Sequence, residues 1–147
     1  IGIFPNCTPS NTGSKFFTDR GMEPEYYLVT RAYQTRHGNG PMTNHGDFKP
    51  LDNAYEQNFD DGPQGIFRKS MLDVDLLKYA IAKDGGFNRG NSTLVVTCLE
   101  HMPRWVYWCD GKEVRFESEA WFCGELAYEL DIDKVVMFKN HKCISNG

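Results

Sequence analysis

The sequence feature that most constrains the fold is a continuous apolar run, STLVVTCL, at residues 92–99. The run has the length of a strand, and its lack of polar alternation is typical of a strand buried on both faces. Such strands belong to parallel sheets that are covered by helices. The run therefore predicts an α/β fold, and 147 residues with 40% hydrophobic side chains suffice for one such domain.

Further strands are predicted on both sides of this run. Short apolar segments at 26–30 and 134–138 predict two more buried strands. Residues 104–117 predict a hairpin that turns on Asp110-Gly111, because Asp-Gly favours the tight turn between antiparallel strands. Residues 1–25 and 37–65, which are rich in glycine, proline and polar residues, are predicted to be loops.

Two helices are predicted between the strands. The first is predicted to be capped by Ser70 and to end at Gly85-Gly86, with helical spacing of Leu72, Leu76, Leu77, Ala80 and Ile81. The second is predicted to begin after Ser118, with one apolar stripe of Trp121, Phe122, Leu126 and Leu130. The order of the predicted strands and helices along the chain predicts a layered α/β fold with a largely parallel sheet, flanking helices and long substrate-binding loops.

Charge and cysteine content exclude several classes of protein. A net charge of −4 argues against nucleic-acid binding through bulk charge, and no apolar stretch approaches the roughly 20 residues of a membrane helix. The five cysteines are odd in number and form no C-x-x-C pair, which argues against a disulfide framework or a zinc site. We therefore expect a cytoplasmic protein without nucleic-acid or membrane partners.

Three loops carry most of the unusual residues. In the first, FPNCTPSNTGS at 4–14, hydroxyl and amide groups surround Gly13, which suits phosphate binding or an ordinary polar turn. In the second, TRAYQTRHGNGP at 30–41, Arg31 and Arg36 precede a Gly-Asn-Gly segment. These side chains suit a phosphate or carboxylate, and the glycines suit backbone contact with a ligand, but solvated arginines on a surface loop give the same pattern.

The third loop is DDGPQGIFRKSMLD at 60–73, where Arg68 and Lys69 precede the predicted helix. Cations beside a helix N-terminus oppose the helix dipole, so they suggest an anionic substrate between the arginine and the helix amides. A solvated pair of cations is the alternative.

Taken in this order, the three loops resemble the adenylosuccinate synthetase family, which joins aspartate to a purine nucleotide with the help of a nucleoside triphosphate. FPNCTPSNTG resembles the family's phosphate-contacting YPFVTSSNT, and VTRAYQTRHGNGPM resembles its KAYTTRVGxGPFPTE. FRKSMLDVDLLKYAI resembles the end of its arginine-rich TTGRPRRCGWFD segment and the LRYA that follows. The resemblance covers roughly residues 4–85 and is weaker beyond them.

The resemblance implies two groups of site residues in the loops. The group that contacts the nucleotide phosphate, ribose and base consists of Ser10, Asn11, Thr12, Arg36, His37 and Gly38. The aspartate-binding group consists of Gly62, Gly65 and Arg68. Arg68 is also the catalytic candidate, because it would hold the aspartate carboxylate or stabilise charge in the transition state.

Two departures from the family pattern bear on the substrate. Gly65 stands where a gapless alignment puts the first arginine, which meets the ribose 2′-hydroxyl in the usual enzymes. Cys98 and Glu100 replace the lysine and aspartate of the guanine-reading TKLD, and the later S-x-G-P appears as FKNH, with Asn140. Together they resemble the bacteriophage 2-aminoadenylosuccinate synthetases, which act on dGMP and aspartate with ATP or dATP.

The resemblance also implies what this chain would not contain. The family's catalytic aspartate and histidine, its glycine-rich triphosphate loop and its Mg²⁺ contacts lie in an N-terminal half that nothing here matches. We therefore expect a C-terminal portion, with substrate-binding loops in 1–70 and helices, strands and base-binding strand ends in 71–147. A homodimer is implied as well. The alternatives are a GTP-dependent synthetase acting on IMP and a non-catalytic nucleotide-binding module.

Overall fold

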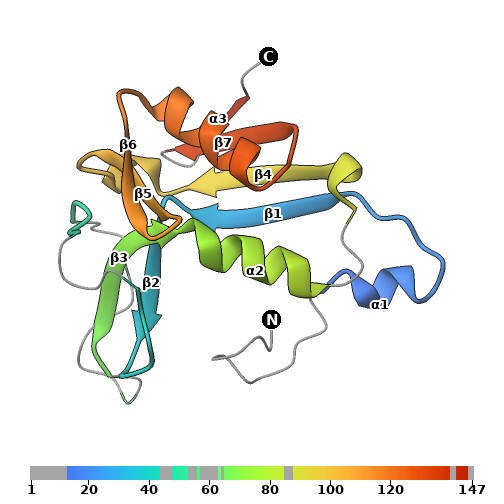
Figure 1. Ribbon diagram of the computed structural model, residues 1–147, viewed down its shortest axis with the longest axis horizontal. Coiled ribbons are helices and arrows are strands. Elements are labelled where there is room, and N and C mark those ends of the chain that lie inside the picture. Colours follow the sequence, from blue (N-terminus) through green and yellow to red (C-terminus); the bar gives the residue numbers. More distant parts are fainter. Residues whose placement is uncertain are drawn as a thin grey trace.

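The computed structural model forms a mixed α/β fold with two sheets and three helices (Figure 1). It describes residues 13–43, 48–52, 56, 63, 65–84 and 88–139, together with the backbone of 142–145. None of the helices in these ranges is long and apolar enough to cross a membrane.

The first sheet is built on three parallel strands. Its order is β1 (Tyr26–Arg31), β4 (Ser92–Thr97) and β7 (Lys134–Lys139), with β8 (Lys142–Ser145) antiparallel to β7 at the far edge. The three parallel strands were predicted from their apolar runs, and the structure confirms them. Strand β4 lies between the other two, as expected for the most continuously apolar segment.

The second sheet was not predicted as a unit. Its order is β2 (Tyr33–His37), β3 (Phe67–Asp73), β5 (Trp105–Cys109) and β6 (Lys112–Phe116). Only the pairing of β3 with β5 is parallel, so the prediction of a largely parallel sheet is correct for one sheet alone. The β5–β6 hairpin is confirmed.

Helix α2 (Val74–Asp84) begins later than predicted. Leu72 lies in strand β3, and Ser70 is buried there with its hydroxyl donating to the Thr43 carbonyl. Asp73 caps the helix instead, because its Oδ1 accepts from the Leu76 amide at 2.9 Å. The predicted end at Gly85-Gly86 falls outside the described residues.

The other helices have mixed outcomes. Helix α3 (Glu119–Glu129) is capped by Ser118 as predicted, with Ser118 Oγ accepting from the Trp121 amide at 3.2 Å. Helix α1 (Lys15–Thr18) is a single turn within a segment that was predicted to be loop. Two short 3₁₀ turns, η1 (Arg89–Asn91) and η2 (Leu99–His101), flank β4.

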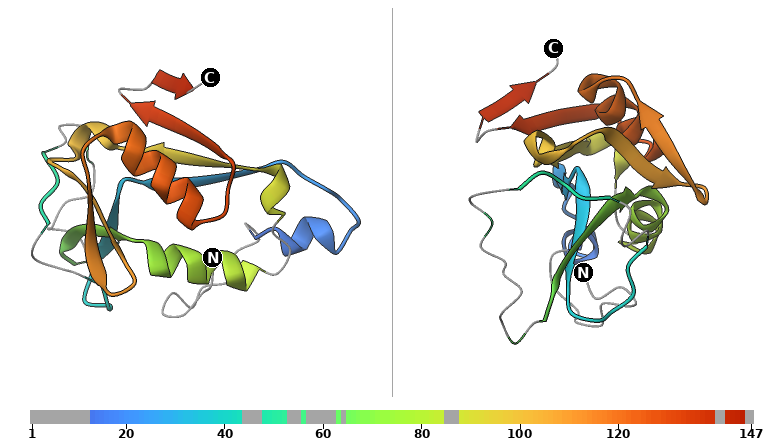
Figure 2. Two further views of the ribbon diagram at one scale, coloured as in Figure 1. Left: turned by 45° about the horizontal axis from the view of Figure 1, so that its top comes forward. Right: turned by 90° about the vertical axis from the view of Figure 1, so that its left-hand side faces the viewer.

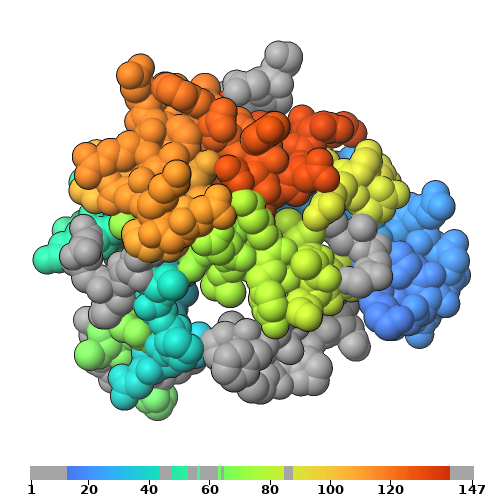
Figure 3. Space-filling view, viewed as in Figure 1, coloured from blue at the N-terminus to red at the C-terminus, as the bar shows by residue number. Residues whose placement is uncertain are grey.

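Helices α2 and α3 lie on the same face of the parallel sheet (Figure 2). The side chains of Leu28 and Leu94 face these helices. The space-filling view shows that α2 also packs directly against the β5–β6 hairpin (Figure 3). On the opposite face, Tyr27 and Val29 are 60% and 68% exposed. The prediction that residues 26–30 form a buried strand is therefore wrong for this face. Trp121, predicted in the α3 core stripe, is also half exposed.

Candidate functional site

The pairing of β2 with β3 brings the second and third loops together. In the antiparallel register Arg36 lies opposite Arg68, and His37 lies opposite Phe67. The His37 and Phe67 rings are in contact, with centroids 4.8 Å apart. Residues from two sequence motifs thus share one two-stranded ribbon, which extends away from the parallel sheet (Figure 1).

The glycines of the two loops meet at the end of this ribbon. The Gly38 amide donates to the Ile66 carbonyl at 3.1 Å, and His37 Nδ1 lies 3.3 Å from the Gly65 carbonyl oxygen. Gly65 has a φ of +78°, and a Cβ there would lie 3.2 Å from the Gly38 Cα. A side chain at position 65 would therefore strain the backbone and crowd Gly38. This geometry disfavours an arginine at position 65.

Arg68 is a strand residue rather than a residue beside a helix N-terminus. Its Nη2 donates to the Gly40 carbonyl at 2.5 Å, and Arg68 Nε is buried with no hydrogen-bond partner among the described residues. The expectation that Arg68 and Lys69 oppose the α2 dipole is thereby wrong, because α2 begins only at Val74. Arg68 instead reaches across the ribbon to the glycine segment.

A second group of candidates lies where the parallel strands end. Arg31 closes β1, and Cys98 and Glu100 follow β4, so they share the carboxyl edge, where ligands bind in open α/β sheets. Cys98 has left-handed backbone geometry, with a φ of +59°. One Glu100 oxygen, Oε2, is buried with no hydrogen-bond partner in the described part of the chain, while Oε1 lies 3.7 Å from His101 Nε2.

Arg31 has an acidic partner in the structure. Its Nη1 forms an ion pair with Glu56 Oε2 at 2.9 Å. Burial alone would lower the pKa of Arg31, but the hydrogen bond to Glu56 and nearby negative groups outweigh burial and raise it. Arg31 was predicted as a forked donor for an anionic ligand; in this structure it is the ion-pair partner of a carboxylate.

Five predicted site residues lie outside the described residues: Ser10, Asn11, Thr12, Gly62 and Asn140. Ser14, which follows Ser10, Asn11 and Thr12 closely in the sequence, lies at the C-terminal end of α2. Its amide donates to Asp84 Oδ1 at 2.9 Å, and its hydroxyl donates to Asp84 Oδ2. The β2–β3 ribbon lies at the opposite end of α2, because β3 runs directly into that helix. The structure therefore does not place this end of the first loop beside the arginines.

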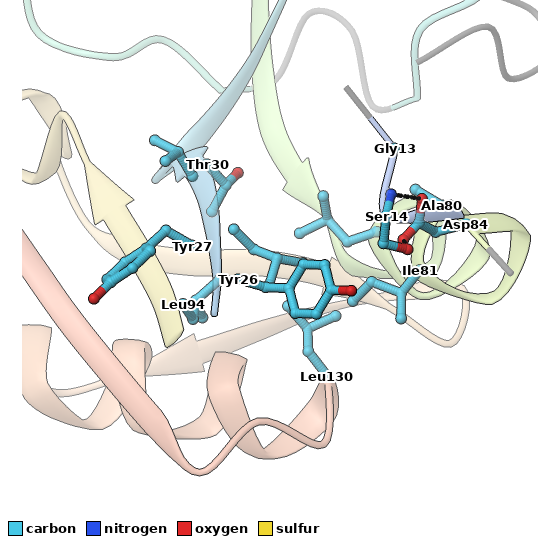
Figure 4. A pocket seen from close by; sticks show the side chains of 13 residues that line it. Gly13, Ser14, Tyr26, Tyr27, Thr30, Ala80, Ile81, Asp84, Leu94 and Leu130 are labelled. Carbon is cyan, nitrogen blue, oxygen red and sulfur yellow. Dashed lines mark hydrogen bonds between the residues drawn. The ribbon is translucent and has the colours of Figure 1, made fainter. Parts of the chain in front are cut away.

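A cavity of about 280 Å³ lies beside β1 and was not predicted (Figure 4). Its walls are mostly apolar and come from β1, α2, Leu94 and Leu130, and the Ser14–Asp84 pair stands at one side. No sequence motif points to it, since its lining residues come from five separate segments.

A hydrogen-bond network around Thr43 was also missed. Gln34 Nε2 donates to the Thr43 carbonyl at 2.9 Å, Ser70 Oγ donates to the same carbonyl at 2.6 Å, and Thr43 Oγ1 donates to Asp73 Oδ2. Spacing rules could not find this network, because Thr43 is 27 residues from Ser70 and 30 from Asp73.

One cluster in the described ranges has the donor set of a metal site. Ligand atoms of Asp75, Cys109 and Asp110 lie within 4.8 Å of one another. The Lys78 ammonium lies 3.4 Å from Cys109 Sγ and pairs with Glu129. Burial raises the pKa of the Cys109 thiol, which keeps it protonated, and Lys78 already supplies positive charge at this place.

No protein-family model matches the chain, and the comparison with curated proteins gives no significant match. The family resemblance therefore rests on the three loop motifs.

Proposed function

We propose that this chain is the substrate-binding part of a C–N ligase of the adenylosuccinate synthetase type. The reaction joins L-aspartate to the 6-position of a purine deoxynucleotide and is driven by hydrolysis of a nucleoside triphosphate. The observation that carries the proposal is the β2–β3 pairing, which sets Arg36 opposite Arg68 although they belong to different motifs. Two cations side by side suit two anionic substrates, a nucleotide and an amino acid.

Each residue would have a separate role. Arg36, His37 and Gly38 would contact the sugar and base, and Arg68 would hold the aspartate carboxylate. The preferred nucleotide would be dGMP, with ATP or dATP as the phosphoryl donor, because Gly65 leaves the ribose 2′-position without an arginine partner. Mg²⁺, the general base and the general acid would come from an N-terminal part, so this chain alone should bind substrates without turning them over.

The first experiment is calorimetric titration of dGMP, GMP and IMP into the chain with L-aspartate present. We expect dGMP to bind at least several-fold more tightly than the other two. Arg68→Ala should remove the dependence on aspartate, because it deletes the donor to the carboxylate. Lys112→Ala is the control: it removes a cation from an exposed position at the start of β6, outside the β2–β3 ribbon.

Each alternative outcome has a definite meaning. A preference for IMP would favour an ordinary synthetase. Equal binding of all three nucleotides without dependence on aspartate would indicate a non-catalytic nucleotide-binding module. A folded chain that binds none of them would contradict the proposal.

A GTP-dependent synthetase is the second candidate, and Glu100 is the observation that favours it. Its buried Oε2 has no hydrogen-bond partner in the described part of the chain and lies at the edge where a base would bind. A carboxylate oxygen there could accept from the ring N–H and amino group of guanine. GTP and ATP titrated into the same chain separate the candidates: tighter GTP binding supports the second, and tighter ATP binding supports the first.

A further inference from the structure

We propose that the segment 38–43, here called the positioning loop, fixes the guanidinium groups of Arg36 and Arg68 before substrate binds. The inference rests on the proposed function, since the two arginines are the groups it assigns to substrate. It differs from the expectation drawn from the sequence, in which Gly38 and Gly40 leave backbone free to contact a ligand. In the structure, Gly40 instead contacts the guanidinium groups of both arginines.

Gly40 is in contact with both guanidinium groups. Its carbonyl accepts from Arg68 Nη2 at 2.5 Å. The Arg36 guanidinium lies against its Cα, because a Cβ built on Gly40 would come within 1.9–2.4 Å of three Arg36 guanidinium atoms. Any side chain at position 40 would therefore displace the end of the Arg36 side chain.

Thr43 anchors the other end of the positioning loop. Its carbonyl accepts from Gln34 of β2 and from Ser70 of β3, and its hydroxyl donates to Asp73. Asp73 also caps α2 through Leu76. One residue thus ties the loop to both strands of the ribbon and to Asp73, the residue that caps α2, so these elements set the position of Gly40.

The Gly40 carbonyl that accepts the hydrogen bond from Arg68 is uncharged, and this affects how Arg68 binds an anion. Among the described residues no carboxylate forms an ion pair with Arg68, whereas Arg31 is paired with Glu56. A carbonyl orients the guanidinium without cancelling its charge, so the charge stays available for an anionic ligand. Donors that are oriented in advance bind charge more tightly than donors that must first be ordered.

Gly40→Ala tests the inference directly. The added methyl meets only the terminal atoms of the Arg36 side chain and no backbone, so the melting temperature should stay within a few degrees of wild type while dGMP affinity falls about tenfold. Thr43→Val should weaken binding by a similar factor because it removes the anchor to Asp73, and Thr43→Ser should restore wild-type affinity. Gly124→Ala is the control, since its methyl enters open space on α3 and should leave affinity unchanged.

A second measurement needs no ligand. The Nε–H signals of Arg36 and Arg68 in nitrogen-15 NMR spectra report how rigidly each guanidinium is held. We expect both signals to exchange faster with water in Gly40→Ala and Thr43→Val than in wild type and Thr43→Ser. If wild type binds no nucleotide, the proposed function fails and these signals alone decide the inference. Unchanged signals, or changed signals with unchanged dGMP affinity, would overturn it.

Discussion

Cys123 shows how burial sets the chemistry of a single side chain. It lies on the inner face of α3 with no exposed surface, and burial, followed by the charge of Glu119, raises the pKa of its thiol to about 12. Its ordinary value is 9.0. Between these values the unfolded chain releases the thiol proton while the folded chain keeps it, so rising pH favours unfolding.

This residue predicts a pH-dependent loss of stability. We expect the free energy of unfolding to fall by about 1 kcal/mol between pH 8 and pH 10 because of Cys123. Urea unfolding of wild type and Cys123→Ala at both pH values measures this, and the variant should lose correspondingly less stability. Burial also raises the pKa of Cys109, which is present in both proteins and so cancels in the comparison. Equal losses in the two proteins would refute the assignment to Cys123.

At the scale of elements, one substitution should have opposite effects in two places. In the turn of the β5–β6 hairpin, Asp110 and Gly111 have φ values of +51° and +75°. Gly124 lies inside α3, where the backbone is helical. A Cβ at either glycine would meet no atom within 4 Å, so packing does not enter the comparison.

We expect Gly111→Ala to destabilise the protein by about 1 kcal/mol, because an L side chain disfavours positive φ. Gly124→Ala should stabilise it by roughly 0.5–1 kcal/mol, because alanine loses less backbone entropy in a helix. Thermal and urea unfolding of the two variants measure these changes side by side. A stabilised Gly111→Ala would mean that the turn does not have this geometry.

At the scale of the whole molecule, strand β1 presents an apolar edge. It is the last strand of its sheet, and none of the described strands pairs with its outer side. Tyr27 and Val29 are exposed on the face opposite the helices. An exposed, apolar edge strand readily pairs with another chain.

We therefore expect this chain to self-associate at high concentration, and Val29→Lys to reduce that association without lowering the melting temperature. Analytical ultracentrifugation over a concentration series measures both proteins. Tyr128→Lys is the matched control, because Tyr128 is 79% exposed on α3 and lies away from the sheet edge. Equal association of wild type and Val29→Lys would show that the β1 edge is not the contact.

The elements that were predicted correctly carry their own local signals. The β5–β6 hairpin turns on Asp110-Gly111, and the N-cap of α3 is a serine directly before the helix. The start of α2 was mispredicted because Ser70 and Asp73 both suit an N-cap, and helical spacing alone did not choose between them. Residues 67–71 of β3 form a strand because they pair with β2, about 30 or more residues earlier in the sequence, and Leu72 and Asp73 pair with β5, which lies later.

For the candidate site, the sequence alone selected residues by type and order: forked cations beside glycines in two separate loops. It also determined the parallel strands, since their apolar runs are readable within a few residues. Only the tertiary structure decided that Arg36 lies opposite Arg68, that Gly40 contacts both guanidinium groups and that Thr43 is hydrogen-bonded to both strands of the ribbon. These contacts join distant residues through strand pairing, and the energy of such pairing depends on neighbours that no local pattern specifies.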